Sequence, residues 1–443
     1  MYTKSIIEST IAKTPNEPEF HQALVEVLSS LSQVIDSDPR YQKSGILEML
    51  VAPERIIQFR IPWLDDTGRT RVNTGWRVQF NRALGPYKGG MRFHPSVNQS
   101  ILKFLGFEQT LKNALTGLPI GGGKGGADFD PRGRSEAEIM RFCQSLMTEL
   151  YKYLGVNEDI PAGDIGVGAK EVGYMYGQYK RITGQVEGVF TGKGIVYGGS
   201  LVRTQAPGYG LLYILNEMLA QKNDGLEGKK VIISGSGDVG TFAAEKAAQL
   251  GGKVVAMNDI DGVIHDEAGI DIETVKEIKI TNRGSISDYK KYHPSVRFSP
   301  KFSDIWQIPC HIALPCATQN EISADDAKAL AANGCIAVAE GANMPCTNEA
   351  IHVIQASGMI YAPGKAANAG GVAVSALEMS QNSQRLSWTF EEVDNRLKGI
   401  MSGIFSQISA AAEEHGMKGN YVVGANIAGF MRVAEAMLAH GVV

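Results

Sequence analysis

Short apolar runs, separated by segments of helix length, dominate the second half of this 443-residue chain. Such runs indicate strands that are covered by helices on both faces, as in a parallel sheet. The expected strands are residues 230–234, 254–257, 312–314, 336–339 and 359–362. Ligands bind such sheets at the carboxyl ends of the strands. The chain is therefore predicted to contain a doubly wound α/β domain.

The first part of the chain mixes strands and helices in a different way. Residues 71–80 alternate, with Val72, Trp76 and Phe80 on one side and Arg77 and Gln79 on the other. This period of two predicts a half-buried strand with one solvated or interfacial face. Helices are expected over residues 97–115 and 136–154.

A glycine-rich turn follows the first expected strand of the doubly wound domain. It reads Gly235-Ser236-Gly237-Asp238-Val239-Gly240 and opens a helix that runs to about residue 250. The glycines allow a pyrophosphate to approach the helix N-terminus, and Asp259, at the end of the next strand, can bind a ribose diol. The prediction is a dinucleotide site; the alternative is an ordinary strand–helix turn.

Two lysines stand in glycine-rich surroundings, Lys88 in residues 85–92 and Lys124 in residues 121–126. Small neighbours let a ligand approach the ammonium, and confinement lowers a lysine pKa because burial disfavours the charged form. The alternative is a solvated lysine in a mobile loop.

Gln109 and Lys112 are three residues apart on the helix expected at 97–115, and so share one face. Together they can hold a carboxylate, although an exposed lysine on a helix is often only solvated. Asp164 lies among small and apolar residues at 160–168. We expect this carboxylate to be poorly hydrated, with a raised pKa suited to proton transfer. The alternative is an N-cap for a helix that begins near Ala169.

Charge and cysteine usage exclude other classes of protein. Lys+Arg 43 against Asp+Glu 47 gives −4, without a run of like charges, which argues against binding to nucleic acid or to an anionic membrane. No apolar stretch of membrane-span or signal-peptide length is evident, so a cytoplasmic protein is expected. Five scattered cysteines and eight histidines without ligand spacing predict neither a disulfide framework nor a metal site.

Several segments together resemble the glutamate dehydrogenases, specifically the short-subunit hexameric branch of the Glu/Leu/Phe/Val dehydrogenase family. The matching segments are residues 85–93, 118–126, 161–168, 315–320, 340–345 and 368–372. The resemblance implies an α/β substrate-binding and oligomerisation domain at 1–197, to which residues 418–443 return. A cleft would separate it from a Rossmann-like dinucleotide-binding domain at 198–417. It also implies a homohexamer.

The activity implied is the reversible oxidative deamination of L-glutamate to 2-oxoglutarate and ammonia. Two alternatives remain: a dehydrogenase for branched-chain or aromatic amino acids, or a binding or regulatory relative that has lost turnover. Lys88 and Ser375 argue against the first alternative, because an apolar side-chain pocket needs no cation. Pro207 and Asp238 motivate the second, because the family usually has a threonine and an asparagine there.

The resemblance also assigns roles to residues of the substrate domain. Lys124 would be a catalytic lysine of depressed pKa that activates water, and Asp164 would shuttle a proton to and from the substrate nitrogen. Lys88 and Ser375 would bind the side-chain carboxylate. Gln109 and Lys112 would bind the α-carboxylate, and Gly163 would also contact the substrate.

The cofactor implied is NAD or NADP. The expected cofactor-binding residues are Pro207, Gly235, Ser236, Gly237, Asp238, Val239, Asp259, Lys279, Arg283 and Asn343. The general rule for Asp259 favours NAD, since a carboxylate repels a 2′-phosphate. Lys279 and Arg283 fall where relatives direct cations to that phosphate, so NADP is the expected preference.

Overall fold

The computed structural model describes residues 1–442, which form two compact units. The first unit comprises residues 1–201, 374–390 and those from Asn426 onward, and the second comprises 202–373 and 391–425. The boundary near residue 201 lies close to the expected one. Residues 374–390 belong to the first unit and 418–425 to the second, unlike the expected division. The reason is that α15 (Gly370–Gln384) and α17 (Tyr421–His440) each continue unbroken across a boundary, so no turn residues mark it.

The first unit is built around a five-stranded mixed sheet of order β1-β2-β4-β3-β5. Its strands are β1 (Arg55–Leu64), β2 (Thr70–Asn81), β3 (Tyr87–Phe93), β4 (Gly122–Ala127) and β5 (Asp159–Gly163). Its helices are α1 (Tyr2–Lys13), α2 (Pro18–Ser37), α3 (Pro39–Lys43), α4 (Ile46–Leu50), α5 (Gln99–Leu115), α6 (Glu136–Leu150) and α7 (Ala169–Thr183). β4, β3 and β5 are parallel neighbours, whereas β1 and β2 are antiparallel.

The helices begin where the sequence provides caps. Asn98 accepts a hydrogen bond from the backbone N–H of Ile101 and starts α5, and Ser135 forms a capping box with Glu138 at the start of α6. α5 packs against β2 and β4 and is covered by α2, while α6 packs against β1 and contacts α7, which also contacts β5. In that second layer the rings of Phe129 and Phe142 stack with centroids 3.8 Å apart.

The face of β2 that is expected to be solvated or interfacial is buried in the second half of the strand. Arg77 and Gln79 are fully buried, because Asp159 on β5 accepts hydrogen bonds from both side chains. The Arg77–Asp159 pair is completely inaccessible to solvent. Val72, expected on the buried side, is exposed near the strand's start.

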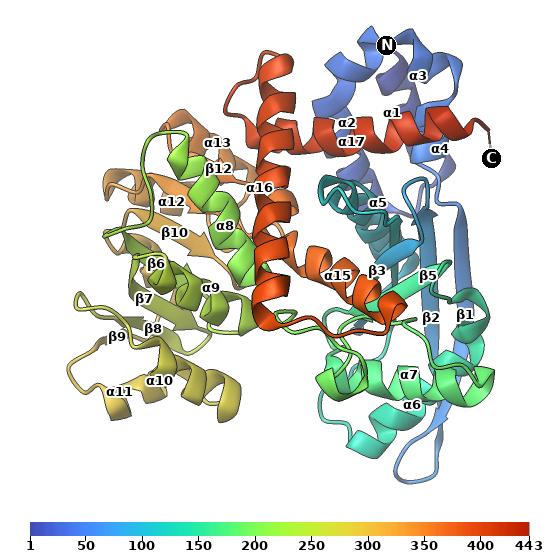
Figure 1. Ribbon diagram of the computed structural model, residues 1–443, viewed down its shortest axis with the longest axis horizontal. Helices are drawn as coiled ribbons and strands as arrows, with labels where there is room; N and C mark the ends of the chain where they lie inside the picture. The colour runs from blue at the N-terminus through green and yellow to red at the C-terminus, as the bar shows by residue number, and fades with distance from the viewer. Residues whose placement is uncertain (443) are drawn as a thin grey trace. The chain divides into compact units, whose positions relative to one another are not determined.

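The second unit contains a seven-stranded sheet of order β12-β11-β10-β6-β7-β8-β9 (Figure 1). Its strands are β6 (Lys230–Ser234), β7 (Lys253–Asp259), β8 (Gly262–His265), β9 (Arg297–Ser299), β10 (Ile312–Pro315), β11 (Ala337–Ala339) and β12 (Ile360–Ala362). Its helices, apart from those shared with the first unit, are α8 (Ala206–Ala220), α9 (Asp238–Gln249), α10 (Ile272–Lys276), α11 (Tyr289–Tyr292), α12 (Ala324–Ala332), α13 (Asn348–Ala356), α14 (Gly364–Ala367) and α16 (Phe390–Glu414).

All five expected strands are present and form the parallel part of this sheet. β6 lies at the centre, with β7 on one side and β10 on the other, so the chain changes direction between β6 and β10. This is the topological switch point at which α/β sheets bind ligands. β8 and β9 extend the sheet in antiparallel fashion.

One described helix, α17, has the length and hydropathy of a membrane-spanning helix, with a mean hydropathy of 1.3 over an 18-residue window. Half of that window is buried inside the protein. Its polar side chains make internal contacts: Asn426 donates to Ser30 Oγ, and Arg432 donates to the carbonyl of Ala114. The apolar character of α17 therefore fits a helix that packs inside the protein. The sequence analysis did not single out this segment as long and apolar enough to span a membrane.

Candidate active site

Three parallel strands of the first unit bring the expected catalytic side chains together. Lys124 lies within β4, and Asp164 follows directly after β5, with β3 between these strands. Gly90 on β3 makes room for this approach, because a Cβ there would lie 2.8 Å from the Cβ of Asp164. Its neighbour Gly89 is equally constrained, since a Cβ would collide with the carbonyl oxygen of Gly123. Glycine is thus required where these strands meet closely.

Asp164 accepts hydrogen bonds from two cationic side chains. Lys124 Nζ lies 2.9 Å from Asp164 Oδ1, and Arg92 Nε lies 2.7 Å from Asp164 Oδ2. Burial lowers the pKa of Lys124 as expected, with the Asp164 carboxylate opposing that effect and Arg92 adding to it. The side chains of both members of the pair are largely buried.

The expected raised pKa of Asp164 is wrong. Burial pushes the pKa upward, but the charges of Lys124 and Arg92 and their hydrogen bonds outweigh it and lower the pKa to about 2. The N-cap alternative is also wrong, because α7 begins at Ala169 with Gly168 as its N-cap. Asp164 is therefore an ionised carboxylate held between two cations.

Lys88 is buried, with 1% of its surface exposed, and donates from Nζ to the carbonyl of Ile160 at 3.0 Å. Its own carbonyl accepts from Asn113 Nδ2 at 3.1 Å, and Asn113 also donates to Gly121 at 2.6 Å. Gln109 Nε2 donates to Asn113 Oδ1 at 2.6 Å. Asn113, which the sequence reasoning missed, therefore fixes both glycine-rich segments to α5. Its position four residues after Gln109 was the available clue.

Lys112 lies on α5 as expected and is half-buried, like Gln109. Lys112 stands in the last turn of α5, where a cation is favourable next to the helix C-terminus.

The segment that carries Thr191 is a second feature that the sequence reasoning missed. Thr191 N donates to the carbonyl of Pro161 on β5, next to the Ile160 that Lys88 contacts. The Thr191 hydroxyl is buried and has no hydrogen-bond partner among residues 1–442. A buried hydroxyl without a partner is costly unless a ligand satisfies it. No sequence pattern marked this residue.

Glu378 on α15 holds the Thr191 segment in place. Its carboxylate accepts from Gly192 N at 2.9 Å and from Lys193 Nζ at 2.7 Å, and both members of this ion pair are buried. Ser375 is buried one turn earlier on the same helix. This arrangement fixes the backbone of the Thr191 segment to the helix that carries Ser375.

In the second unit, the glycine-rich turn lies at the switch point between β6 and β10. Gly235 has φ +78°, and a Cβ there would lie 3.0 Å from Ala317, which follows β10. A Cβ at Gly240 would collide with the carbonyl of Gly235, whereas one at Gly237 would meet no atom within 4 Å. Gly235 and Gly240 thus allow close packing of the backbone, whereas Gly237 leaves open space at the turn.

This turn fits the pyrophosphate of a dinucleotide. Gly237 is the N-cap of α9 and supplies no side-chain cap, so the first N–H groups of the helix remain for an anion. The buried hydroxyl of Ser236 has no partner in the described part of the chain. Asn258 Oδ1 accepts from Gly235 N at 2.7 Å and holds the turn, a contact that the sequence reasoning missed.

Asp259 ends β7, as expected, but its carboxylate already has several donors. It accepts from Lys279 Nζ at 2.6 Å and from the backbone N–H of Ile286 at 2.7 Å. Lys279 is therefore not a solvated residue on a surface helix, whereas Arg283 is exposed, with φ +53°. The Asp259–Lys279 ion pair reduces the negative charge at this edge of the sheet.

The remaining expected cofactor residues occupy the same edge region or flank it. Pro207 lies in the first turn of α8, and Val239 follows Asp238 in the first turn of α9. Desolvation raises the pKa of the Asp238 carboxyl, and the Arg203 guanidinium opposes that rise. Asn343 follows β11 and accepts a hydrogen bond from Asn368 Nδ2 at 2.9 Å.

Residues 1–442 contain no cluster of three or more histidine, cysteine, aspartate or glutamate side chains that could hold a metal ion. All five cysteines are free thiols and are buried.

Comparison with known proteins gives consistent matches over nearly the whole chain. Residues 198–441 match the family described as Glutamate/Leucine/Phenylalanine/Valine dehydrogenase, and residues 53–181 match the Glu/Leu/Phe/Val dehydrogenase dimerisation domain. The chain is 53% identical to the NADP-specific glutamate dehydrogenase of Helicobacter pylori, covering 100% of both chains. It is 52% identical to the NAD(P)-specific glutamate dehydrogenase of Xylanibacter ruminicola, again over 100% of both. The crystal structure of Plasmodium falciparum glutamate dehydrogenase superposes with a TM-score of 0.97 and 48% identity, covering 100% of this chain and 95% of that one.

Proposed function

The chain belongs to the Glu/Leu/Phe/Val dehydrogenase family, and we propose that it is a glutamate dehydrogenase that prefers NADP. It would catalyse the reversible oxidative deamination of L-glutamate to 2-oxoglutarate and ammonia. The observation that carries the choice of substrate is the buried ammonium of Lys88. A buried cation favours an anionic ligand group and opposes an apolar side chain. Glutamate therefore suits this site better than leucine, phenylalanine or valine.

The substrate carboxylates would be bound at two places in the first unit. Lys88 and Ser375, with the partnerless hydroxyl of Thr191, would hold the side-chain carboxylate. Gln109 and Lys112 on α5 would hold the α-carboxylate, with Gly163 beside the substrate. Fixing both ends of a dicarboxylate orients the α-carbon, which is the main contribution a protein makes to hydride-transfer chemistry.

Lys124 and Asp164 would act on the reacting atoms. Burial lowers the pKa of Lys124, which makes its neutral form more accessible, and the neutral amine would activate the water that adds to the imine. In its charged form Lys124 would stabilise the negative charge that develops on the oxygen bound to the carbon that becomes the carbonyl. Asp164, which is ionised, would hold the substrate nitrogen and carry a proton to and from it.

The second unit would bind the cofactor along the carboxyl edge of its parallel strands. When bound, the nicotinamide cofactor supplies or accepts the hydride. Residues 235–239 would cradle the pyrophosphate, and Pro207 and Asn343 would flank the nicotinamide half. Lys279 pairs with Asp259 and so offsets the repulsion between that carboxylate and a 2′-phosphate. The exposed Arg283 adds a second cation. This charge balance supports NADP over NAD.

The test is a spectrophotometric assay with purified protein. Oxidation of NADPH should depend on both 2-oxoglutarate and ammonia, and NADPH should give a higher kcat/KM than NADH. The 2-keto acids of leucine, valine and phenylalanine should give little turnover in the same assay. Turnover with those keto acids but not with 2-oxoglutarate would overturn the proposed substrate, and a higher kcat/KM with NADH would overturn the cofactor preference.

Two further properties are part of this proposal. The match of residues 53–181 to a dimerisation domain supports an oligomer, and we propose a cytoplasmic homohexamer. Sedimentation velocity should give a single species of six subunits, and fractionation of the source cells should recover the protein with the cytosol. Neither nucleic acid nor a membrane is expected as a partner.

A further inference from the structure

Two cysteines stand side by side at the amino ends of neighbouring strands in the second unit. Cys310 precedes β10 by two residues, and Cys335 precedes β11 by two residues. These strands are parallel, with Ile312 opposite Ala337, and the carbonyl of His311 accepts from the Ile336 backbone at 2.8 Å. The pairing of the two chain segments thus continues beyond the amino ends of β10 and β11. Cys310 and Cys335 therefore lie opposite each other.

The separation of adjacent strands suits a covalent link between these two residues. Neighbouring strands lie about 4.7–4.9 Å apart, and disulfides join residues whose Cα atoms are about 4.4–6.8 Å apart. Both side chains pack into one buried cluster, in which the Cys335 thiol donates to the carbonyl of Ala337 at 3.2 Å.

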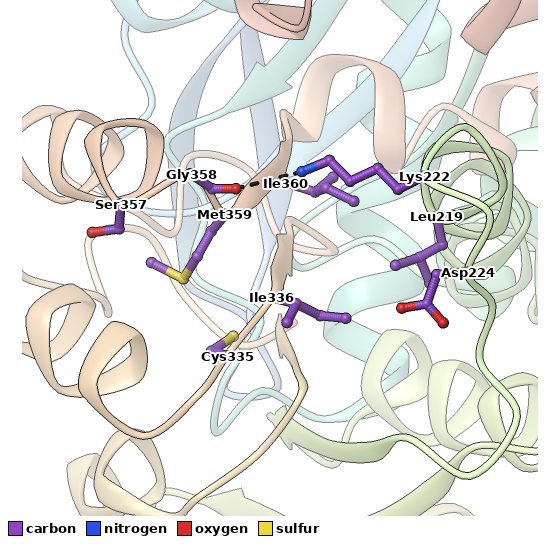
Figure 2. Close-up of a pocket in the computed structure, with 9 residues that line it drawn as sticks. All are labelled: Leu219, Lys222, Asp224, Cys335, Ile336, Ser357, Gly358, Met359 and Ile360. Carbon is purple, nitrogen blue, oxygen red and sulfur yellow. Dashed lines mark hydrogen bonds between the residues drawn. The ribbon is translucent and has the colours of Figure 1, made fainter.

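Both cysteines are buried, but only one of the two lines a pocket. Cys335 lines a pocket of about 270 Å³, whose other walls include Leu219, Lys222 and Met359 (Figure 2). Cys310 is not among the residues that line this pocket. The pocket opens at the amino ends of β11 and β12, at the opposite edge from the glycine-rich turn. A small molecule can therefore reach Cys335 without using the proposed cofactor site.

The electrostatic surroundings of the two thiols also differ. The neighbouring Cys310 side chain lowers the pKa of Cys335, whereas the Cys335 side chain and burial raise the pKa of Cys310. Burial raises the pKa of the thiols of Cys143, Cys316 and Cys346, which stay protonated. Reactivity of a cysteine follows its thiolate fraction and its access.

We propose that Cys335 and Cys310 form a reversible dithiol–disulfide site, at which Cys335 reacts first with a low-molecular-weight disulfide that enters the pocket. The Cys335 thiolate attacks one sulfur of the incoming disulfide, forms a mixed disulfide and releases one thiol. Cys310 then loses its proton, attacks the Cys335 sulfur and releases the second thiol. The protein dithiol is oxidised by two electrons, and the small disulfide is reduced to two thiols.

The experiment uses the full-length folded protein and glutathione disulfide as the probe. After incubation, free thiols are blocked with N-ethylmaleimide, and unreduced peptides are identified by mass spectrometry. The expected product is a peptide pair linked through Cys310 and Cys335, with Cys143, Cys316 and Cys346 blocked by the maleimide. Dithiothreitol should restore both thiols. A linked pair that forms only in the urea-unfolded chain would overturn the proposal.

Three variants test the order of reaction, each checked for folding by its circular dichroism and thermal transition. Cys310→Ser should stop at a single glutathione adduct on Cys335, and Cys335→Ser should carry no adduct on Cys310. Cys346→Ser is the matched control, because Cys346 is buried in the same cluster and should leave the linked pair unchanged. A glutathione adduct on Cys310 in the Cys335→Ser variant, or none on Cys335 in the Cys310→Ser variant, would refute the assigned order. The readout is independent of the proposed dehydrogenase activity, so the two proposals can fail separately.

Discussion

Replacing Asp164 with asparagine tests the proposed proton transfer most directly. The amide keeps the size of the side chain but removes the charge that Lys124 and Arg92 contact at 2.9 and 2.7 Å. General acid–base groups typically contribute about 10²–10⁴-fold to the rate. We therefore expect kcat/KM for glutamate to fall by that factor, or about 3–5 kcal/mol in the barrier.

The pH profile separates the roles of the two groups. The pKa of Asp164 is about 2, so its ionisation cannot account for a change in rate near neutral pH. Lys124 must lose its proton to act as a base, and so kcat/KM for glutamate oxidation should rise with pH through the lowered pKa of Lys124. The Asp164 carboxylate favours the protonated lysine. Asp164→Asn should therefore move this rise to lower pH, while Lys124→Ala should abolish turnover.

The measurement is initial-rate kinetics from pH 6 to 10 for the wild type and both variants, with circular dichroism to confirm folding. Asp130→Asn serves as the control, because Asp130 is a partly exposed carboxylate that pairs with Arg132 outside the site. An Asp164→Asn variant within about tenfold of the wild type, equivalent to about 1.4 kcal/mol, would refute the role of Asp164. A shift of the rise to higher pH would refute the electrostatic reasoning.

Three other outcomes follow from the structure. Lys88→Leu should lower kcat/KM for glutamate by about 2–5 kcal/mol, because a substrate carboxylate then lacks its buried cation, and should affect norvaline far less; equal losses would show a structural role. Asp159→Asn should lower the free energy of unfolding in guanidinium chloride by about 3–5 kcal/mol, since Arg77 is left as a buried unpaired charge; a loss below about 1 kcal/mol would show that Arg77 finds another partner. Lys279→Ala should reduce the ratio of kcat/KM for NADP to that for NAD by about tenfold, because Asp259 then faces the 2′-phosphate unpaired; an unchanged ratio would contradict the charge argument.

The parallel strands of the second unit could be predicted because each is a short apolar run that ends in turn residues. β8 and β9 could not, since β8 has only two consecutive apolar residues, Val263 and Ile264, and β9 has only one, Phe298. β8 depends on antiparallel pairing with β7, and β9 on antiparallel pairing with β8. Their short sequences contain no period long enough to identify a strand. Two boundaries of the units, after residues 373 and 425, could not be predicted either, because α15 and α17 continue across them.

Within the candidate site, sequence motifs indicated which residues matter but not their protonation. The pKa of Asp164 depends on Lys124, 40 residues away, and on Arg92, 72 residues away. These contacts exist only because β4, β3 and β5 are neighbours in the sheet. Likewise, Arg77 stands at a polar position of the alternating pattern in β2, where a surface residue is expected. Its burial depends on Asp159, which lies on a different strand. Thr191 lacks any motif, and only its buried hydroxyl reveals it.

The way the chain is divided between the units has a consequence for its biosynthesis. A ribosome releases the chain from its N-terminus, and domains generally fold as units as they emerge. The second unit is complete once residue 425 has left the ribosome, whereas the first, although it begins the chain, still lacks α17 beyond Asn426. Until then the Ala114 carbonyl lacks its contact from Arg432, and Ser30 lacks that from Asn426. The unit that is translated first is therefore the last to be completed, and a stop codon at any of positions 426 to 432 would remove the Arg432 contact to the amino-terminal unit.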